Sequence, residues 1–234
     1  MILTLLALPL SLLGMQQQGG AARGAIAQRL AGRVTPDVAV LVDELSTAAS
    51  ARGLPVDPLI QKAIEGSAKG VPVERVALAV RQVAMQLDTA AAALREGGVV
   101  TDTLVIAAGA FAINAGLSAN DITALARTGA SAPALTVGLR VAGTLSAMGV
   151  PSAEDIGLIS TKLRSGQPAD ELLSLPANVQ AEVARGSTPA QAAAGLERAA
   201  AAQGRHGPPP GRGNPPPHPP HPPAPPHPPA PPHP

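Results

Sequence analysis

Residues 72–96 read PVERVALAVRQVAMQLDTAAAALRE, and this stretch decides the fold class. Its aliphatic residues recur at alternating spacings of three and four, which is the period of one face of an α-helix. The members of this stripe are Val73, Val76, Val80, Val83, Leu87, Ala90 and Leu94. The polar residues that fall outside the stripe, and that we expect to form a solvated face, are Arg75, Arg81, Gln82, Gln86 and Asp88. The stretch therefore predicts a long amphipathic helix that buries one side.

Signals for helix boundaries recur on both sides of this stretch. A residue with a side-chain oxygen acceptor directly precedes a proline at three places: Thr35-Pro36, Asp57-Pro58 and Thr188-Pro189. Such pairs are typical of helix starts, because the oxygen can cap free N–H groups and proline suits the first helical position. Ser118 with Asp121, and Ser152 with Asp155, have the spacing of a capping box, with Asp in place of Glu. Glycines stand where helices should end, at Gly53, Gly70, Gly98, Gly116, Gly149 and Gly166. These signals predict a series of short helices.

The segment from Thr103 to Ile113 has no polar face, so we expect it at the buried centre of the domain. Its β-branched residues would suit a buried strand, but its Ala and Gly residues and its helical neighbours favour a helix.

An internal echo appears when Gly53 is aligned with Gly149, an offset of 96 residues. The offset matches Pro55 with Pro151, Ile60 with Ile156, Gly70 with Gly166, Pro72 with Pro168, and Glu74 with Asp170. Two interpretations stay open: degenerate repeats of a helical hairpin, or repeated use of Gly and Pro as stops in an Ala-rich helical chain. Either one predicts an all-α fold of stacked short helices or helical hairpins.

An apolar run from Ile2 to Leu13 opens the chain. It has the length of the central region of a secretory signal and is too short to span a bilayer, which takes about 20 helical residues. We therefore expect a signal peptide at 1–14, a flexible linker at 15–34, a helical domain at 35–203 and a Pro/His-rich tail at 204–234. A buried helix of the mature fold is the alternative for the apolar run. Export would place the protein in the periplasm, at the envelope or outside the cell, with no transmembrane span in the mature chain.

Charge and composition argue against nucleic acid as a partner. The 17 Lys and Arg residues nearly balance the 16 Asp and Glu residues, so no net field attracts a polyanion. Phe111 is the single aromatic residue, which leaves no platform for stacking bases. The chain also has no cysteine, and therefore no thiol nucleophile and no disulfide.

The predicted helical domain lacks the usual catalytic groups, because all five histidines lie in the tail. Its adjacent carboxylates are Asp43-Glu44, Glu154-Asp155 and Asp170-Glu171. Neighbouring helical positions point about 100° apart, and the last two pairs fall in expected first turns, where negative charge stabilises the helix dipole. We expect no enzymatic activity, no catalytic residue and no bound cofactor, with a hydrolase that uses a carboxylate pair as a minor alternative.

The tail repeats Pro-Pro-His and Pro-Pro-Ala triplets from Pro216 to the end of the sequence. A period of three matches polyproline II, so we expect residues 204–234 to be disordered or to form an extended arm with its histidines on one edge. The candidate metal ligands are His218, His221, His227 and His233. At about 3.1 Å per residue they lie roughly 9 or 19 Å apart, too far for one arm to surround a zinc ion. Weak binding of Zn, Cu or Ni, and bridging between arms, stay open.

Two further interpretations of the tail compete with metal binding. Its histidines would gain charge below about pH 6.5 and could then bind anionic wall polymers or lipid. We favour a spacer or docking ligand, since proline-rich segments lose little entropy on binding. The sequence thus predicts an exported, non-enzymatic interaction or structural module that binds a protein or envelope polymer through the helical domain or the tail. A metal-handling protein is the alternative.

Overall fold

The computed structural model describes residues 24–99, 102–166 and 168–205, and this part of the chain is helical, with no strand. A short helix at 24–30, called the N-terminal helix below, precedes the longer elements. These are α2 (Pro36–Ala51), α3 (Asp57–Ala68), α4 (Val73–Glu96), α5 (Thr103–Asn114), α6 (Ala119–Ala126), α7 (Ala132–Ala147), α8 (Ser152–Arg164), α9 (Ala169–Leu173), α10 (Leu175–Ala184) and α11 (Pro189–Arg205). The predicted all-α fold of stacked short helices is confirmed.

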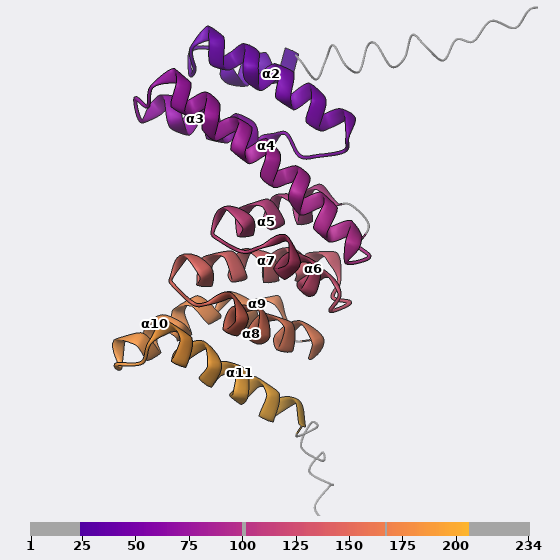
Figure 1. The fold of residues 1–234 in the computed structure, drawn as a ribbon, viewed down its shortest axis with the longest axis vertical. Helices are drawn as coiled ribbons and strands as arrows, with labels where there is room; N and C mark the ends of the chain where they lie inside the picture. The colour runs from indigo at the N-terminus through magenta and orange to yellow at the C-terminus, as the bar shows by residue number, and fades with distance from the viewer. Residues whose placement is uncertain (1–23, 100–101, 167, 206–234) are drawn as a thin grey trace, which may run out of the picture.

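The helices form an elongated stack with α2 at one end and α11 at the other (Figure 1). A continuous series of contacts runs from α3 through α4, α5, α7 and α8 to α11. At the first end α2 packs on α3 and α4, and at the last end α11 packs on α8 and α10. One apolar cluster follows the whole series, from Ile26 to Ala193. The two ends of the stack are therefore separate surfaces.

Glycines end the helices as predicted. At the end of α2, Gly53 has a φ of 72°, a conformation that costs glycine little. The N–H of Gly53 donates to the carbonyl oxygen of Ser50, and the N–H of Leu54 donates to that of Ala49, each at 3.0 Å. This pair of hydrogen bonds is the Schellman motif, and Leu54 turns back into the core. Positive φ angles are found at all the predicted stops, Gly53, Gly70, Gly98, Gly116, Gly149 and Gly166.

A helix starts at each of the three predicted places, with Pro36 and Pro189 as first residues as predicted. At α3 the first helical residue is Asp57 rather than Pro58, and Val56 takes the cap position, so the cap predicted at Asp57 is wrong. Their capping differs. Thr188 and Gln191 form a reciprocal cap at α11: the Thr188 hydroxyl accepts from the Gln191 N–H at 3.2 Å, and the Gln191 side chain accepts from the Thr188 N–H at 3.0 Å. Thr35 makes no side-chain cap hydrogen bond at α2. The proline, rather than the oxygen before it, marks the start there.

One of the two predicted capping boxes is present. The Ser118 hydroxyl accepts from the Asp121 N–H at 3.2 Å, and the Asp121 carboxylate accepts from the Ser118 N–H at 2.8 Å, which starts α6. The box predicted at Ser152 and Asp155 is wrong. Pro151 takes the cap position of α8, so Ser152 is already the first helical residue and Asp155 is buried.

The apolar stripe of the quoted stretch lies in α4 and faces the core, with Val76, Val80, Leu87 and Leu94 buried. The prediction of a solvated face is wrong at Gln86. That side chain is 7% exposed, and its amide nitrogen donates to the Asn114 side chain at 3.2 Å. Helix α5 covers this part of α4, which sequence periodicity alone does not reveal.

The segment expected at the buried centre forms α5, a helix as predicted, packed between α4 and α7. Two of its large side chains depart from the expectation of complete burial. Leu104 is 63% exposed and Phe111 is 46% exposed, because the helix is covered on two sides and open on the rest.

Residues 24–30 correct the expectation of a flexible linker across 15–34, because they are helical. Leu30 is 2% exposed and belongs to the core cluster, so this part of the segment is structural. The Arg29 guanidinium also pairs with the Asp57 carboxylate at the start of α3. The predicted signal peptide lies outside the described residues.

In the internal echo, the offset of 96 residues aligns the sequence of α2 with that of α7 and the sequence of α3 with that of α8. The glycines that end the aligned helices also match. The third elements differ, since α4 has 24 residues and α9 has 5. The similarity therefore covers two helices and the turn between them.

Substitutions at the two faces of α5 test this packing. Ile106 is fully buried, so Ile106→Ala should lower the free energy of unfolding by about 2–5 kcal/mol through the lost contacts and the resulting cavity. Leu104→Ala, on the exposed face, should change it by less than about 0.5 kcal/mol. Urea unfolding followed by circular dichroism measures both. Equal effects would show that α5 is not oriented as described.

Candidate functional site

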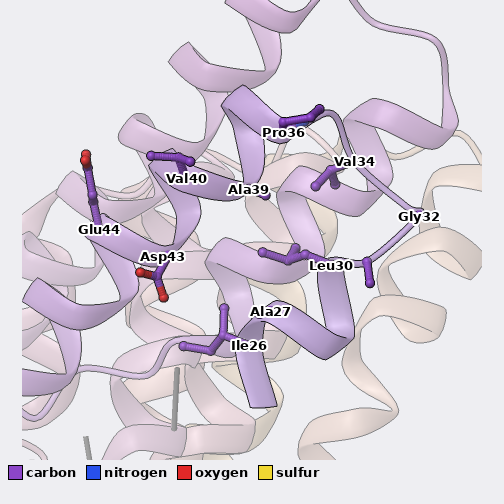
Figure 2. Close-up of a pocket in the computed structure, with 11 residues that line it drawn as sticks. Ile26, Ala27, Leu30, Gly32, Val34, Pro36, Ala39, Val40, Asp43 and Glu44 are labelled. Carbon is purple, nitrogen blue, oxygen red and sulfur yellow. The ribbon is translucent and has the colours of Figure 1, made fainter. Parts of the chain in front are cut away.

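A groove of about 530 Å³ lies between the N-terminal helix and α2, at the first end of the stack. Its apolar walls come from both helices and from the turn that joins them (Figure 2). These walls include Ile26, Leu30, Val34, Pro36, Ala39 and Val40. Its volume lies within the range of clefts that bind ligands in proteins, and its lining is mainly apolar.

Helical spacing and small side chains produce this groove. Ile26 and Leu30 are four residues apart and lie on one face of the N-terminal helix, while Ala39, Val40 and Asp43 share a face of α2. Ala27 and the neighbouring Ala31 and Gly32 contribute little volume, so the space between the helices stays open. Val40 is 60% exposed, although it is apolar.

Two carboxylates, Asp43 and Glu44, complete the lining. Figure 2 shows Asp43 on the side of α2 that faces Ile26, and Glu44 pointing away from the apolar side chains. Among the described residues that line the groove there is no cationic side chain. Arg29 pairs with Asp57 instead, so the groove combines apolar walls with an acidic edge.

A smaller groove, of about 190 Å³, lies where α3, α4 and α5 meet. It contains Phe111 and the hydrogen-bonded pair Gln86 and Asn114. The ring of Phe111 rests on α7, where a Cβ at Gly143 would come within 2.8 Å of it. The absence of a side chain at Gly143 therefore leaves the space on α7 that the ring of Phe111 occupies.

A third hollow, of about 240 Å³, lies near α11. Lys162 of α8 and Glu171 of α9 pair across it at 3.5 Å. Lys162 is largely buried and Glu171 half-exposed, so the pair joins two helices at a partly shielded position.

Asp155 is the most unusual ionisable group of the described residues. Its side chain is fully buried, and neither carboxyl oxygen has a hydrogen-bond partner. Burial, with a smaller contribution from the negative charge of Asp121, raises the pKa of Asp155 to about 8. The carboxyl is therefore mostly protonated at neutral pH, and a neutral acid is a much cheaper buried group than a carboxylate.

Sequence reasoning missed the burial of Asp155, because it interpreted the residue as a cap. A signal was present: Leu158 and Ile159 follow it at spacings of three and four, which places Asp155 on the buried stripe of α8. The three acidic pairs do not come together. Asp43-Glu44 lies at the first groove, Glu154-Asp155 in the first turn of α8, and Asp170-Glu171 in the first turn of α9.

The predicted metal ligands His218, His221, His227 and His233 lie outside the described residues. Within the described ranges, no group of three or more His, Asp or Glu side chains could hold a metal ion. No helix in this part of the chain has the length and apolar content needed to cross a membrane.

A scan with protein-family models gave no match, and comparisons with curated proteins and with solved structures gave none either.

The stability of the protein should depend on pH through Asp155. Its pKa in the fold, about 8, exceeds the value near 4 of an unfolded aspartate, so between these values the folded state binds more protons. Stability should therefore fall as pH rises from 4 to 8, by at most about 1.4 kcal/mol per pH unit from this group. Asp155→Asn should reduce this slope and make the protein more stable than wild type at pH 8.

Glu154→Gln is the matched control, because it replaces a carboxyl by an amide in the same helical turn without touching the buried carboxyl. Urea unfolding at several pH values compares the three proteins. If Asp155→Asn and the wild type show the same slope, the buried carboxyl does not titrate as described.

Proposed function

We propose that this protein is an exported, non-enzymatic interaction module whose groove between the N-terminal helix and α2 binds a polypeptide segment. The observation that carries the proposal is the groove itself, an open apolar surface with an acidic edge at one end of the stack. In this proposal the Pro/His-rich tail is an arm for docking or spacing that continues from the other end, beyond α11.

The exposed side chain of Val40 supports a binding role. Val40 is exposed in a groove that the described part of the chain leaves open, and apolar surface of this kind gains free energy when a partner covers it. The two carboxylates at the edge add specificity, because they favour a segment that carries a basic side chain beside its apolar residues.

The alternatives have less support. A carboxylate-dependent hydrolase needs two acids that face each other across a cleft, whereas the three pairs of this chain lie on separate elements. The metal-handling alternative depends on tail histidines, for which the described residues provide no further ligand cluster. Export is proposed because the apolar run at 2–13 has the length of a signal segment.

Site-specific cross-linking tests the binding role. A photoreactive side chain at Val40 of the full chain, produced in its native host, should capture protein partners. The same group at Leu78 of α4 is the control, because Leu78 is 64% exposed and thus about as accessible as Val40. It should capture fewer partners, because Leu78 lies outside the groove. Mass spectrometry identifies the products.

The proposal fails if both positions capture the same proteins in the same amounts. A second variant separates binding from chance proximity. Asp43→Lys should reduce capture at position 40, because it places a positive charge where the partner is expected to carry one. Its circular dichroism spectrum and urea midpoint provide the check on folding.

A further inference from the structure

The two ends of the stack differ in what they present. Helices α2 and α11 lie at opposite ends of the stack (Figure 1). The first end has the groove between the N-terminal helix and α2, which the described residues leave open. The last end has α11, after which the sequence continues with residues 206–234. The groove at the N-terminal helix and the helix that precedes the tail therefore lie at opposite ends of each molecule.

The chemistry of the groove selects for a particular kind of segment. Its polar side chains are the two carboxylates Asp43 and Glu44, which accept hydrogen bonds and donate none when ionised. An ordinary peptide would bury backbone N–H groups against the apolar walls without partners, at a cost for each one. A proline-rich segment has few N–H groups and avoids this cost.

The tail of this chain has the matching composition. Residues 208–234 consist mainly of proline with interspersed alanine and histidine, and no acidic residue follows Glu197. Arg212 and the histidines are its ionisable groups, and their N–H groups can donate to carboxylates. Apolar rings would meet the apolar walls, and the guanidinium of Arg212 and the imidazole N–H groups would meet the acidic edge.

From this complementarity we infer that residues 208–234 of one molecule bind the groove between the N-terminal helix and α2 of a second copy. The inference rests on the proposed function, because it names the occupant of the same groove. Since groove and tail are different surfaces, the contact is heterologous: each copy offers its tail to one neighbour and its groove to another. The molecules associate head to tail into open chains.

Two variants separate the halves of this contact. Val40→Glu introduces a charge into the groove at an exposed position and leaves the tail intact. A chain that ends at Arg205 keeps all the helices that the structure describes and every residue of the core cluster but loses the tail. Leu78→Glu is the control for Val40→Glu, since it places the same charge on an equally exposed site of α4.

Sedimentation velocity over a range of micromolar concentrations gives the readout. The mass of the wild-type chain and of Leu78→Glu should increase with concentration, while Val40→Glu and the chain ending at Arg205 should each stay monomeric. An equimolar mixture of those two variants should form a complex of one copy of each and nothing larger, because only one groove and one tail remain functional.

The contribution of the acidic edge is measured with a labelled synthetic peptide of residues 208–234 and the chain that ends at Arg205. Asp43→Asn and Glu44→Gln should each weaken binding by about twofold to fivefold, the range of an exposed ion pair. Glu74→Gln, on α4 and outside the groove, should leave the affinity unchanged.

The inference is overturned if the mixture of variants contains only monomers, or if Val40→Glu associates as the wild type does. It is also overturned if the wild type stays monomeric and Val40→Glu gains a larger hydrodynamic radius at the same mass, because the tail then binds the groove of its own molecule. If the mixture stays monomeric while position 40 still captures other proteins specifically, this inference fails and the proposed function stands.

Discussion

The stack depends on the burial of one aliphatic side chain at the end of a helix. A glycine turns the chain there, and the aliphatic residue that follows the glycine packs into the core. After the glycines that end α2, α5 and α7, the side chains of Leu54, Leu117 and Val150 are buried. The helices are short and rich in alanine, so each one has few large side chains to bury. Anchoring the turn itself fixes the direction in which the next helix packs, and stacking on neighbours then completes the core.

This dependence on local turns explains why helix boundaries could be predicted and buried faces could not. Gly53 and Pro36 act through their own backbone geometry, which holds wherever they occur. Gln86, Phe111 and Asp155 depend instead on which helix covers them. Ser118–Asp121 and Ser152–Asp155 have the same spacing, yet only the first forms a cap. For the second pair, the buried face of α8 determines the outcome, and local sequence does not specify that face unambiguously.

The candidate site was beyond sequence reasoning for the same reason. The stretch 24–34 contains alanine, glycine and arginine in a pattern that suits a flexible linker, and two aliphatic residues four apart give a weak helical signal. Packing of Leu30 into the core and pairing of Arg29 with Asp57 fix the helix in place. The groove then results from the contact between the N-terminal helix and α2, which the sequence alone does not reveal. The proline and histidine content of the tail, in contrast, is visible in the sequence itself.

A stack of hairpins leaves an incomplete surface at each end, and such ends are usually closed by polar faces. Here the first end keeps Val40 exposed beside a groove lined by alanine and glycine. The left-handed conformation of Gly32, with a φ of 68°, disfavours any larger residue at that point of the lining, so the turn that joins the two helices helps to keep the groove open. Under the proposal that a polypeptide segment covers this groove, a proline-rich ligand suits it because its backbone demands few hydrogen-bond acceptors.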